Sequence, residues 1–127
     1  MKIYGIGTDI TNIQRIKKSI KNKKFLKRFF NNIEITKCEK QLNKTNCYAK
    51  RFAAKEAFSK ALGTGISGGI NLKEIIIENT SSGKPKIRLL GKTKDKLKKI
   101  IKKKKYNIYL SLSDEKQFAV ANVIISV

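Results

Sequence analysis

An alanine-rich segment in the middle of the chain places the strongest constraint on the fold. We predict a helix from about Thr45 to Leu62 that stops at Gly63, because its residues favour helix and glycine commonly ends one. Two apolar stripes recur along it at helical spacing. They consist of Ala49, Phe52 and Ala53 on one face and Ala54, Ala57, Phe58 and Ala61 on the other. We therefore expect this helix to be buried on two sides.

The segments around this helix are typical of short strands and helices. Short β-prone runs predict strands, and apolar residues three or four apart predict helices. Strands are expected at 3–10, 75–77, 86–89, 108–112 and 118–124, and helices at 13–20, 25–30 and 92–105. This order predicts one α+β domain over residues 1–127, with helices packed on a largely antiparallel sheet.

Two short patterns predict where early helices begin. Thr11-Asn12-Ile13-Gln14 and Thr36-Lys37-Cys38-Glu39 both match the capping box, in which a threonine and an acid or amide three residues later cap a helix start. In the first helix, Ile13, Ile16 and Ile20 form the apolar stripe and Arg15 faces outward.

The chain is strongly basic. It carries 30 Lys and Arg against nine Asp and Glu, a formal net charge of +21, and only four of the cations are Arg. Such a balance indicates either an acidic partner or a compositional bias toward Lys. A nucleic-acid-binding module is the alternative of another class, supported by the lysines near 96–105. Few Arg and no interleaved aromatics argue against it.

Histidine is absent, which excludes histidine-based catalysis and histidine metal ligands. Cys38 and Cys47 have no other soft ligand nearby, so a zinc site is not expected, and they are interpreted as ordinary free thiols. No apolar run is long enough for a membrane span, and the first residues lack an export signal. These features predict a cytoplasmic protein.

Carboxylates are scarce, so the positions of two of them are informative. Asp9 ends the first predicted strand, and Glu56 lies inside the long helix between small residues, one turn before Lys60. A strand-end turn and an exposed Glu–Lys pair are the structural explanations. Two carboxylates without His or Cys instead suit a hard cation such as Mg²⁺. Lys60, Arg51 and Lys55 would supply phosphate-binding charge beside it.

The glycines after the long helix match a dinucleotide-binding motif by letter only. Gly63-Thr64-Gly65-Ile66-Ser67-Gly68 reads G-x-G-x-x-G. That motif must follow a strand and open a helix, whereas this segment closes a helix. We therefore predict no dinucleotide site. A phosphate-contacting loop remains open beside a plain helix stop.

Four motifs, in order along almost the whole chain, carry a family resemblance. They are Gly5-Ile6-Gly7-Thr8-Asp9-Ile10, the long run from Arg51-Phe52-Ala53-Ala54-Lys55-Glu56 to Gly63-Thr64-Gly65-Ile66, Gly83-Lys84-Pro85, and Ser111-Leu112-Ser113. Together they resemble the holo-[acyl-carrier-protein] synthases, which are small 4′-phosphopantetheinyl transferases. The resemblance implies that family's fold and the transfer of 4′-phosphopantetheine from coenzyme A to a serine of apo-acyl carrier protein. Adenosine 3′,5′-bisphosphate is released, and the product serves fatty acid biosynthesis.

The resemblance also implies roles for the carboxylates. Asp9 and Glu56 would hold Mg²⁺ with the coenzyme A pyrophosphate, and Lys60 would contact the phosphates and share in catalysis. The serine hydroxyl would attack the β-phosphate, with charge neutralisation doing most of the work. The proton acceptor stays open between Glu56 and a water at the metal.

Further positions follow from the same resemblance. Arg51 would lie near the nucleotide, the Gly63-Thr64-Gly65 turn and Lys84-Pro85 would line the cofactor groove, and Arg15 would meet the acidic carrier protein. A homotrimer with active sites between subunits is expected, without nucleic acid or membrane as partner. The doubly apolar long helix independently favours an oligomer.

One position departs from the family pattern. Many members have histidine where this chain has Asp114. A role in phosphate contact therefore does not carry over. Asp114 would orient a cation or water, or cap a turn, and we favour the turn.

Overall fold

The computed structural model describes residues 1–65, 69–103 and 105–127. One strand is followed by several helices, a strand pair, a helix and a second strand pair, which is the order that the sequence predicts. The elements are β1 (Ile3–Asn12), α1 (Ile13–Ser19), α2 (Lys23–Phe29), α3 (Asn32–Glu39), α4 (Lys44–Leu62), a 3₁₀ turn η1 (Leu72–Glu74), β2 (Ile75–Asn79), β3 (Pro85–Leu89), α5 (Gly91–Ile101), β4 (Asn107–Asp114) and β5 (Phe118–Ser126).

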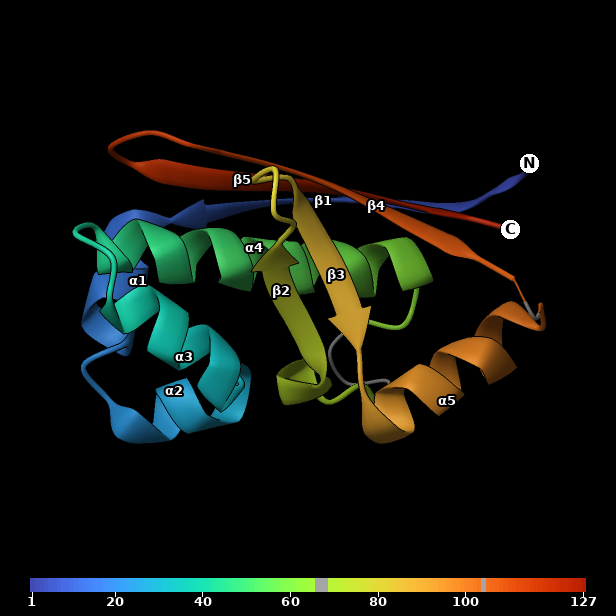
Figure 1. Ribbon diagram of the computed structural model, residues 1–127, viewed down its shortest axis with the longest axis horizontal. Helices are drawn as coiled ribbons and strands as arrows, with labels where there is room; N and C mark the ends of the chain where they lie inside the picture. Colours follow the sequence, from blue (N-terminus) through green and yellow to red (C-terminus); the bar gives the residue numbers. More distant parts are fainter. Residues whose placement is uncertain (66–68, 104) are drawn as a thin grey trace.

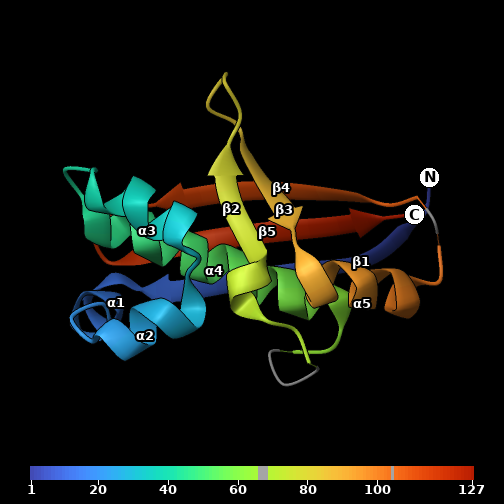
Figure 2. The same ribbon diagram turned by 60° about the horizontal axis from the view of Figure 1, so that its bottom comes forward.

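The strands form two antiparallel sheets. The larger sheet has the order β1-β5-β4, so the first and last strands of the chain are neighbours, and β2 and β3 form a separate hairpin. Figure 1 shows the larger sheet as a layer over α4, with α1–α3 at one end and α5 at the other. The hairpin crosses α4, and its tip projects away from the helices (Figure 2). The predicted α+β architecture is confirmed.

Strand β1 lies unusually close to α4 because two glycines face the helix. A Cβ added at Gly7 would overlap the carbonyl oxygen of Ala57, and one at Gly5 would overlap that of Ala61. Side chains alternate along a strand, so Asp9 points the same way as these glycines. Since the strand meets Ala61 first and Ala57 next, Asp9 arrives at the part of α4 that carries Glu56.

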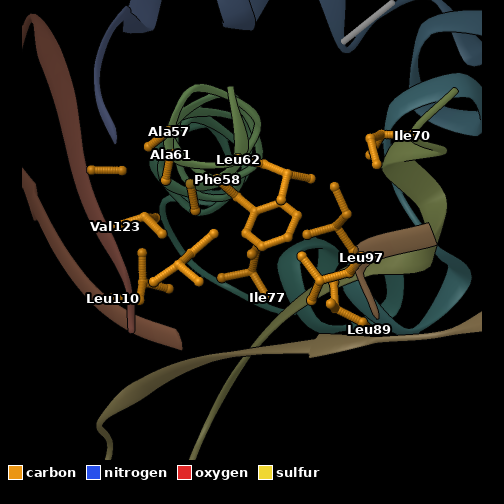
Figure 3. Close-up of a cluster of buried hydrophobic side chains, with 14 of the residues drawn as sticks. Ala57, Phe58, Ala61, Leu62, Ile70, Ile77, Leu89, Leu97, Leu110 and Val123 are labelled. Carbon is orange, nitrogen blue, oxygen red and sulfur yellow. The ribbon is translucent and has the colours of Figure 1, made fainter. Parts of the chain in front are cut away.

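The main hydrophobic core lies between α4, the larger sheet, the hairpin and α5. Phe58 is fully buried and extends from α4 toward Ile77, Leu89 and Leu97 (Figure 3). Ala57 and Ala61 pack on the side of Val123. A second cluster joins α1–α3 to the start of α4 around Phe30 and Tyr48. Both apolar faces of α4 are therefore covered within one chain, as its two stripes predict.

Two of the predicted helix starts are wrong. Thr11 still belongs to β1, which pairs with β5 as far as Asn12, and Asn12 is the residue that caps α1. Thr36 lies inside α3, whose capping box is formed by Asn31 and Glu34. In each case an asparagine nearer the true boundary satisfies the free N–H groups, so the threonine is not needed as a cap. The predicted strands, and the end of α4 at Gly63 with φ +84°, are confirmed.

The last helix is shorter than predicted. Helix α5 ends at Ile101 rather than at Lys105, and Lys102 adopts a left-handed φ of +58°. Ile101 is the last residue of the buried stripe, and Lys102 and Lys103 after it are exposed. Residue 104 lies outside the described part of the chain, as do residues 66–68 of the G-x-G-x-x-G segment. Within the described residues no helix is long and apolar enough to cross a membrane.

The interpretation of the cysteines as free thiols is wrong. Cys38, near the end of α3, and Cys47, in the first turn of α4, form a disulfide. The prediction missed it because spacing along the chain does not reveal how two helices pack. The bridge fixes the end of α3 against α4.

Candidate active site

Asp9, Glu56 and Lys60 come together where β1 crosses α4. The Lys60 ammonium donates to the carbonyl oxygen of Thr8 at 3.0 Å and lies 3.4 Å from Asp9 Oδ1. The other oxygen of Asp9 accepts a hydrogen bond from the Thr11 hydroxyl at 2.7 Å. Thr11 thus orients the aspartate instead of capping a helix. Asp9 is held on both oxygens while Lys60 remains largely exposed.

Glu56 lies on α4 one turn before Lys60, and the electrostatics of its carboxyl group agree with that position. Burial raises the pKa of Glu56, and the negative charge of Asp9 raises it further. The charges of Lys60 and Arg15 act in the opposite direction on this pKa. Two carboxylates and two cations therefore share one region, and the outward-facing Arg15 of α1 belongs to it.

The pair of carboxylates suits Mg²⁺. Burial raises the pKa of Glu56 first and the like charge of Asp9 raises it further, and a divalent cation bound by both carboxylates would relieve the repulsion between them. Mg²⁺ typically takes one or two carboxylates and fills its other positions with water and phosphate oxygens. Among the residues that the structure describes, no cluster of three or more potential ligands forms a closed metal cage. An open site completed by substrate fits this donor set.

Arg51 lies in a separate basic pocket. A cavity of about 550 Å³ is bordered by Lys37, Lys40, Lys50 and Arg51, with Asp114 as its acidic member. Only 5% of Arg51 is exposed, and burial lowers its pKa. Its guanidinium donates to Cys47 O at 3.3 Å and to Asn79 Oδ1 at 3.5 Å. The buried Nε has no hydrogen-bond partner among the described residues.

The remaining predicted groove residues do not all meet within one chain. Lys84 and Pro85 line a different cavity of about 460 Å³, bordered by Tyr109 and Ile124 of the larger sheet. The turn of Gly63, Thr64 and Gly65 follows Lys60 at the end of α4, and the Thr64 hydroxyl donates to Gly65 O at 3.1 Å. The single chain therefore presents a carboxylate site, a basic pocket and a mainly apolar cavity.

Lys55 is not available for phosphate binding, contrary to the prediction. Its ammonium is buried and is bonded to Glu34, to Phe29 O at 2.8 Å and to Leu72 O at 2.8 Å. Burial lowers the pKa of Lys55 to about 8. Sequence reasoning missed its partner Glu34, although the pattern Asn31-x-x-Glu34 was a signal for it. The pair holds α2, α3 and η1 against α4.

Asp114 contacts α4 instead of capping a turn, so the favoured interpretation of this residue is wrong. Its Oδ2 accepts a hydrogen bond from Asn46 Nδ2 at 2.6 Å, and its Oδ1 lies 3.6 Å from the Lys50 ammonium. The alternative in which it orients a cation is the one observed. Asn46, at the start of α4, was not predicted to take part.

The fold and the carboxylate site are those of a known class of transferase, as the similarity of this sequence to other proteins shows. Residues 5–122 match the family model described as the 4′-phosphopantetheinyl transferase superfamily. A holo-[acyl-carrier-protein] synthase of Pelagibacter ubique is 50% identical over 125 residues, which are 98% of each chain. The chain therefore belongs to the holo-[acyl-carrier-protein] synthases of this superfamily, and the resemblance seen in its motifs is confirmed.

Solved structures agree over almost the full length. The crystal structure of holo-[acyl-carrier-protein] synthase from Neisseria meningitidis has a TM-score of 0.86 at 36% identity, covering 98% of this chain and 99% of that one. The enzyme from Helicobacter pylori, solved in complex with coenzyme A, has a TM-score of 0.80 at 34% identity. It covers 95% of this chain and 99% of that one.

Proposed function

We propose that this chain transfers 4′-phosphopantetheine from coenzyme A to a serine of apo-acyl carrier protein and releases adenosine 3′,5′-bisphosphate. The observation that carries the proposal is the meeting of Asp9, Glu56 and Lys60 at the crossing of β1 and α4. The relatives named holo-[acyl-carrier-protein] synthase support it. We further propose that the enzyme acts in the cytoplasm and serves fatty acid biosynthesis, as the family resemblance implies.

In the proposed reaction the serine oxygen forms a bond to the β-phosphorus of coenzyme A. The bond from that phosphorus to the adenosine bisphosphate breaks, and the serine proton passes to Glu56 or to water. Asp9 and Glu56 would hold Mg²⁺, which when bound neutralises pyrophosphate charge. The Lys60 ammonium is exposed and lies beside Asp9, and it would contact the phosphate oxygens.

The basic pocket is the proposed site for the nucleotide end of coenzyme A. Arg51 and Lys50 supply positive charge there for the phosphates of the nucleotide. The Gly63-Thr64-Gly65 turn would line the groove beyond Lys60. The H. pylori enzyme was solved in complex with coenzyme A, which supports coenzyme A as the ligand of this chain.

We also propose a homotrimer, and the larger sheet supplies the surface for it. On its outer face Ile6 and Ile10 are 63% and 62% exposed, and Tyr109 and Ile124 are exposed beside them. The helix α4, from which an oligomer was expected, is already covered. A neighbouring chain on this sheet face would border the cavity of Lys84 and Pro85, which would then line a groove between subunits.

Arg15 is the proposed contact for the acidic carrier protein. It lies exposed on α1, and its charge reaches Glu56. A carrier bound there would bring its serine close to the carboxylate site. Electrostatic attraction of this kind affects partner binding more than the chemical step.

A direct assay tests the reaction and the carboxylate site together. Apo-acyl carrier protein is incubated with coenzyme A and Mg²⁺, and mass spectrometry detects one added phosphopantetheine. Asp9→Asn and Glu56→Gln keep the side-chain shape but remove charge. Each should lower kcat/KM by about a hundredfold, a loss of ~2.7 kcal/mol in transition-state stabilisation. Asp95→Asn, on the exposed surface of α5, is the matched control and should leave activity unchanged.

The possible results distinguish a failure of the transfer reaction from a failure of the proposed metal site. No mass shift with the wild-type chain across several carriers would refute the transferase. Modification that survives EDTA, or survives both substitutions, would leave the reaction standing and reject the metal site.

A further inference from the structure

The two cysteines join the candidate nucleotide pocket to the end of α3. Cys38 is fully buried, whereas Cys47 is 7% exposed and borders the basic pocket. Their bridge encloses residues 39–46, and the connecting segment 40–43 within it also borders the pocket. Whether this disulfide is formed or reduced therefore affects part of the pocket wall.

Arg51 lies next to the Cys47 sulfur and also borders the pocket in which an anion would bind. Its Nη1 lies 3.1 Å from Cys47 Sγ, and the same guanidinium is the most buried positive charge of the pocket. In the disulfide the sulfur carries no charge, and Arg51 keeps its full attraction for an anion. In the reduced pair a guanidinium at this distance stabilises the Cys47 thiolate. That thiolate would compete with a phosphate for Arg51.

Two effects of reduction thus act in the same direction. Breaking the bridge frees the segment that carries Lys40 and Asn43, so a ligand must order it again on binding. The new thiolate partly neutralises Arg51. Both effects weaken anion binding in the reduced form.

We propose that Cys38 and Cys47 form a reversible thiol–disulfide site, with a low-molecular-weight disulfide such as glutathione disulfide as its reagent, and that the bridged form binds the nucleotide more tightly. The control of the pocket rests on the proposed function, whereas the redox chemistry of the pair does not. No role in the transfer reaction requires either cysteine.

The oxidation step balances in two exchanges. The Cys47 thiolate attacks one sulfur of glutathione disulfide, and the first glutathione leaves as a thiolate. The Cys38 thiolate then attacks the Cys47 sulfur and expels the second glutathione. The protein loses two protons and two electrons, and two glutathione thiols are formed. Cys47 reacts first because Cys38 has no exposed surface.

The test uses the full chain equilibrated in buffers of stepped glutathione to glutathione disulfide ratio. Alkylation and mass spectrometry count the free thiols, and calorimetry measures binding of adenosine 3′,5′-bisphosphate to each form. We expect a transition between two thiols and none. The reduced form should bind the nucleotide about threefold to tenfold more weakly.

A double variant provides the matched control. Cys38→Ala with Cys47→Ala cannot form the bridge, so its nucleotide affinity should be low and should not change with the glutathione ratio. Wild-type protein in its two redox states gives the same comparison if the variant folds poorly.

Each contrary result has a distinct meaning. Two free thiols at every ratio would overturn the redox site. A disulfide with equal affinity in both forms would overturn the control of the pocket. If neither form binds the nucleotide, the pocket control fails together with its assignment under the proposed function, while the thiol count still reports on the redox site.

Discussion

The buried side chains of Lys55 and Glu34 form an ion pair that connects several elements of the fold. Besides the ion pair, Glu34 accepts hydrogen bonds from the backbone N–H of Asn31 and of Ile77. The pair thereby reaches the start of α3 and the hairpin strand β2 at once. Removing one partner leaves a charge in the interior, which proteins tolerate poorly.

We predict that Lys55→Met lowers the free energy of unfolding by about 3–5 kcal/mol, because Glu34 would be left buried without its cation. Lys86→Met is the matched control, since Lys86 pairs with Glu78 at 3.6 Å on the surface. It should cost about 0–1 kcal/mol. Urea unfolding of both variants measures the difference. Equal costs would show that the buried pair is not a special source of stability.

We predict that Arg15 contributes to binding of the carrier protein. Arg15→Glu should raise KM for the carrier protein about tenfold while leaving KM for coenzyme A nearly unchanged, and added salt should weaken wild-type binding in the same sense. Lys94→Glu on α5 makes the same charge change far along the chain and should have little effect. Steady-state kinetics with each substrate varied in turn provides the measurement. Unaltered carrier kinetics would remove Arg15 from the interface.

The contact of β1 with α4 decides where the catalytic groups lie. Gly7 leaves no room for a side chain against the Ala57 carbonyl, and Asp9 follows two residues later on the same strand face. The close approach therefore sets the separation between the two candidate metal ligands. It is a property of two elements packed together and of neither one alone.

We predict that Gly7→Ala lowers the free energy of unfolding by about 1–3 kcal/mol, since the strand must move away from the helix. Activity should fall as well, because Asp9 moves with the strand. Thr8→Ala, at the next position and on the opposite sheet face, removes only an exposed hydrogen bond to Asn122 and should cost less, about 0.5 kcal/mol. Thermal unfolding and the phosphopantetheine assay give the two measurements. A stable and fully active Gly7→Ala protein would contradict the tight packing.

We predict that the complete protein assembles into a homotrimer. Light scattering should give about three times the chain mass of 14.4 kDa at micromolar concentration. Ile6→Glu would put a charge on the exposed apolar sheet face, and it should yield monomers with little activity. Ile33→Glu changes another half-exposed isoleucine, on α3, and should leave the trimer intact. A fully active wild-type monomer would refute this assembly.

Local sequence was sufficient for most elements of this protein. The alanine-rich run and Gly63 predicted α4, and the β-prone runs predicted the strands of both hairpins, because helix propensity, periodicity and turn chemistry act over a few neighbouring residues. The motifs also singled out Asp9, Glu56 and Lys60, which the fold brings together. Their catalytic roles stay predictions.

Long-range packing decided the rest. Glu34 and Lys55 are 21 residues apart and Asn46 and Asp114 are 68 apart, so no local pattern pairs them. Cys38 and Cys47 are close in sequence, but their bond depends on how α3 meets α4. The sequence shows which residues are charged, apolar or cysteine. Which charges are buried, which cysteines touch and which sheet face stays open depend on contacts that form only when distant segments pack.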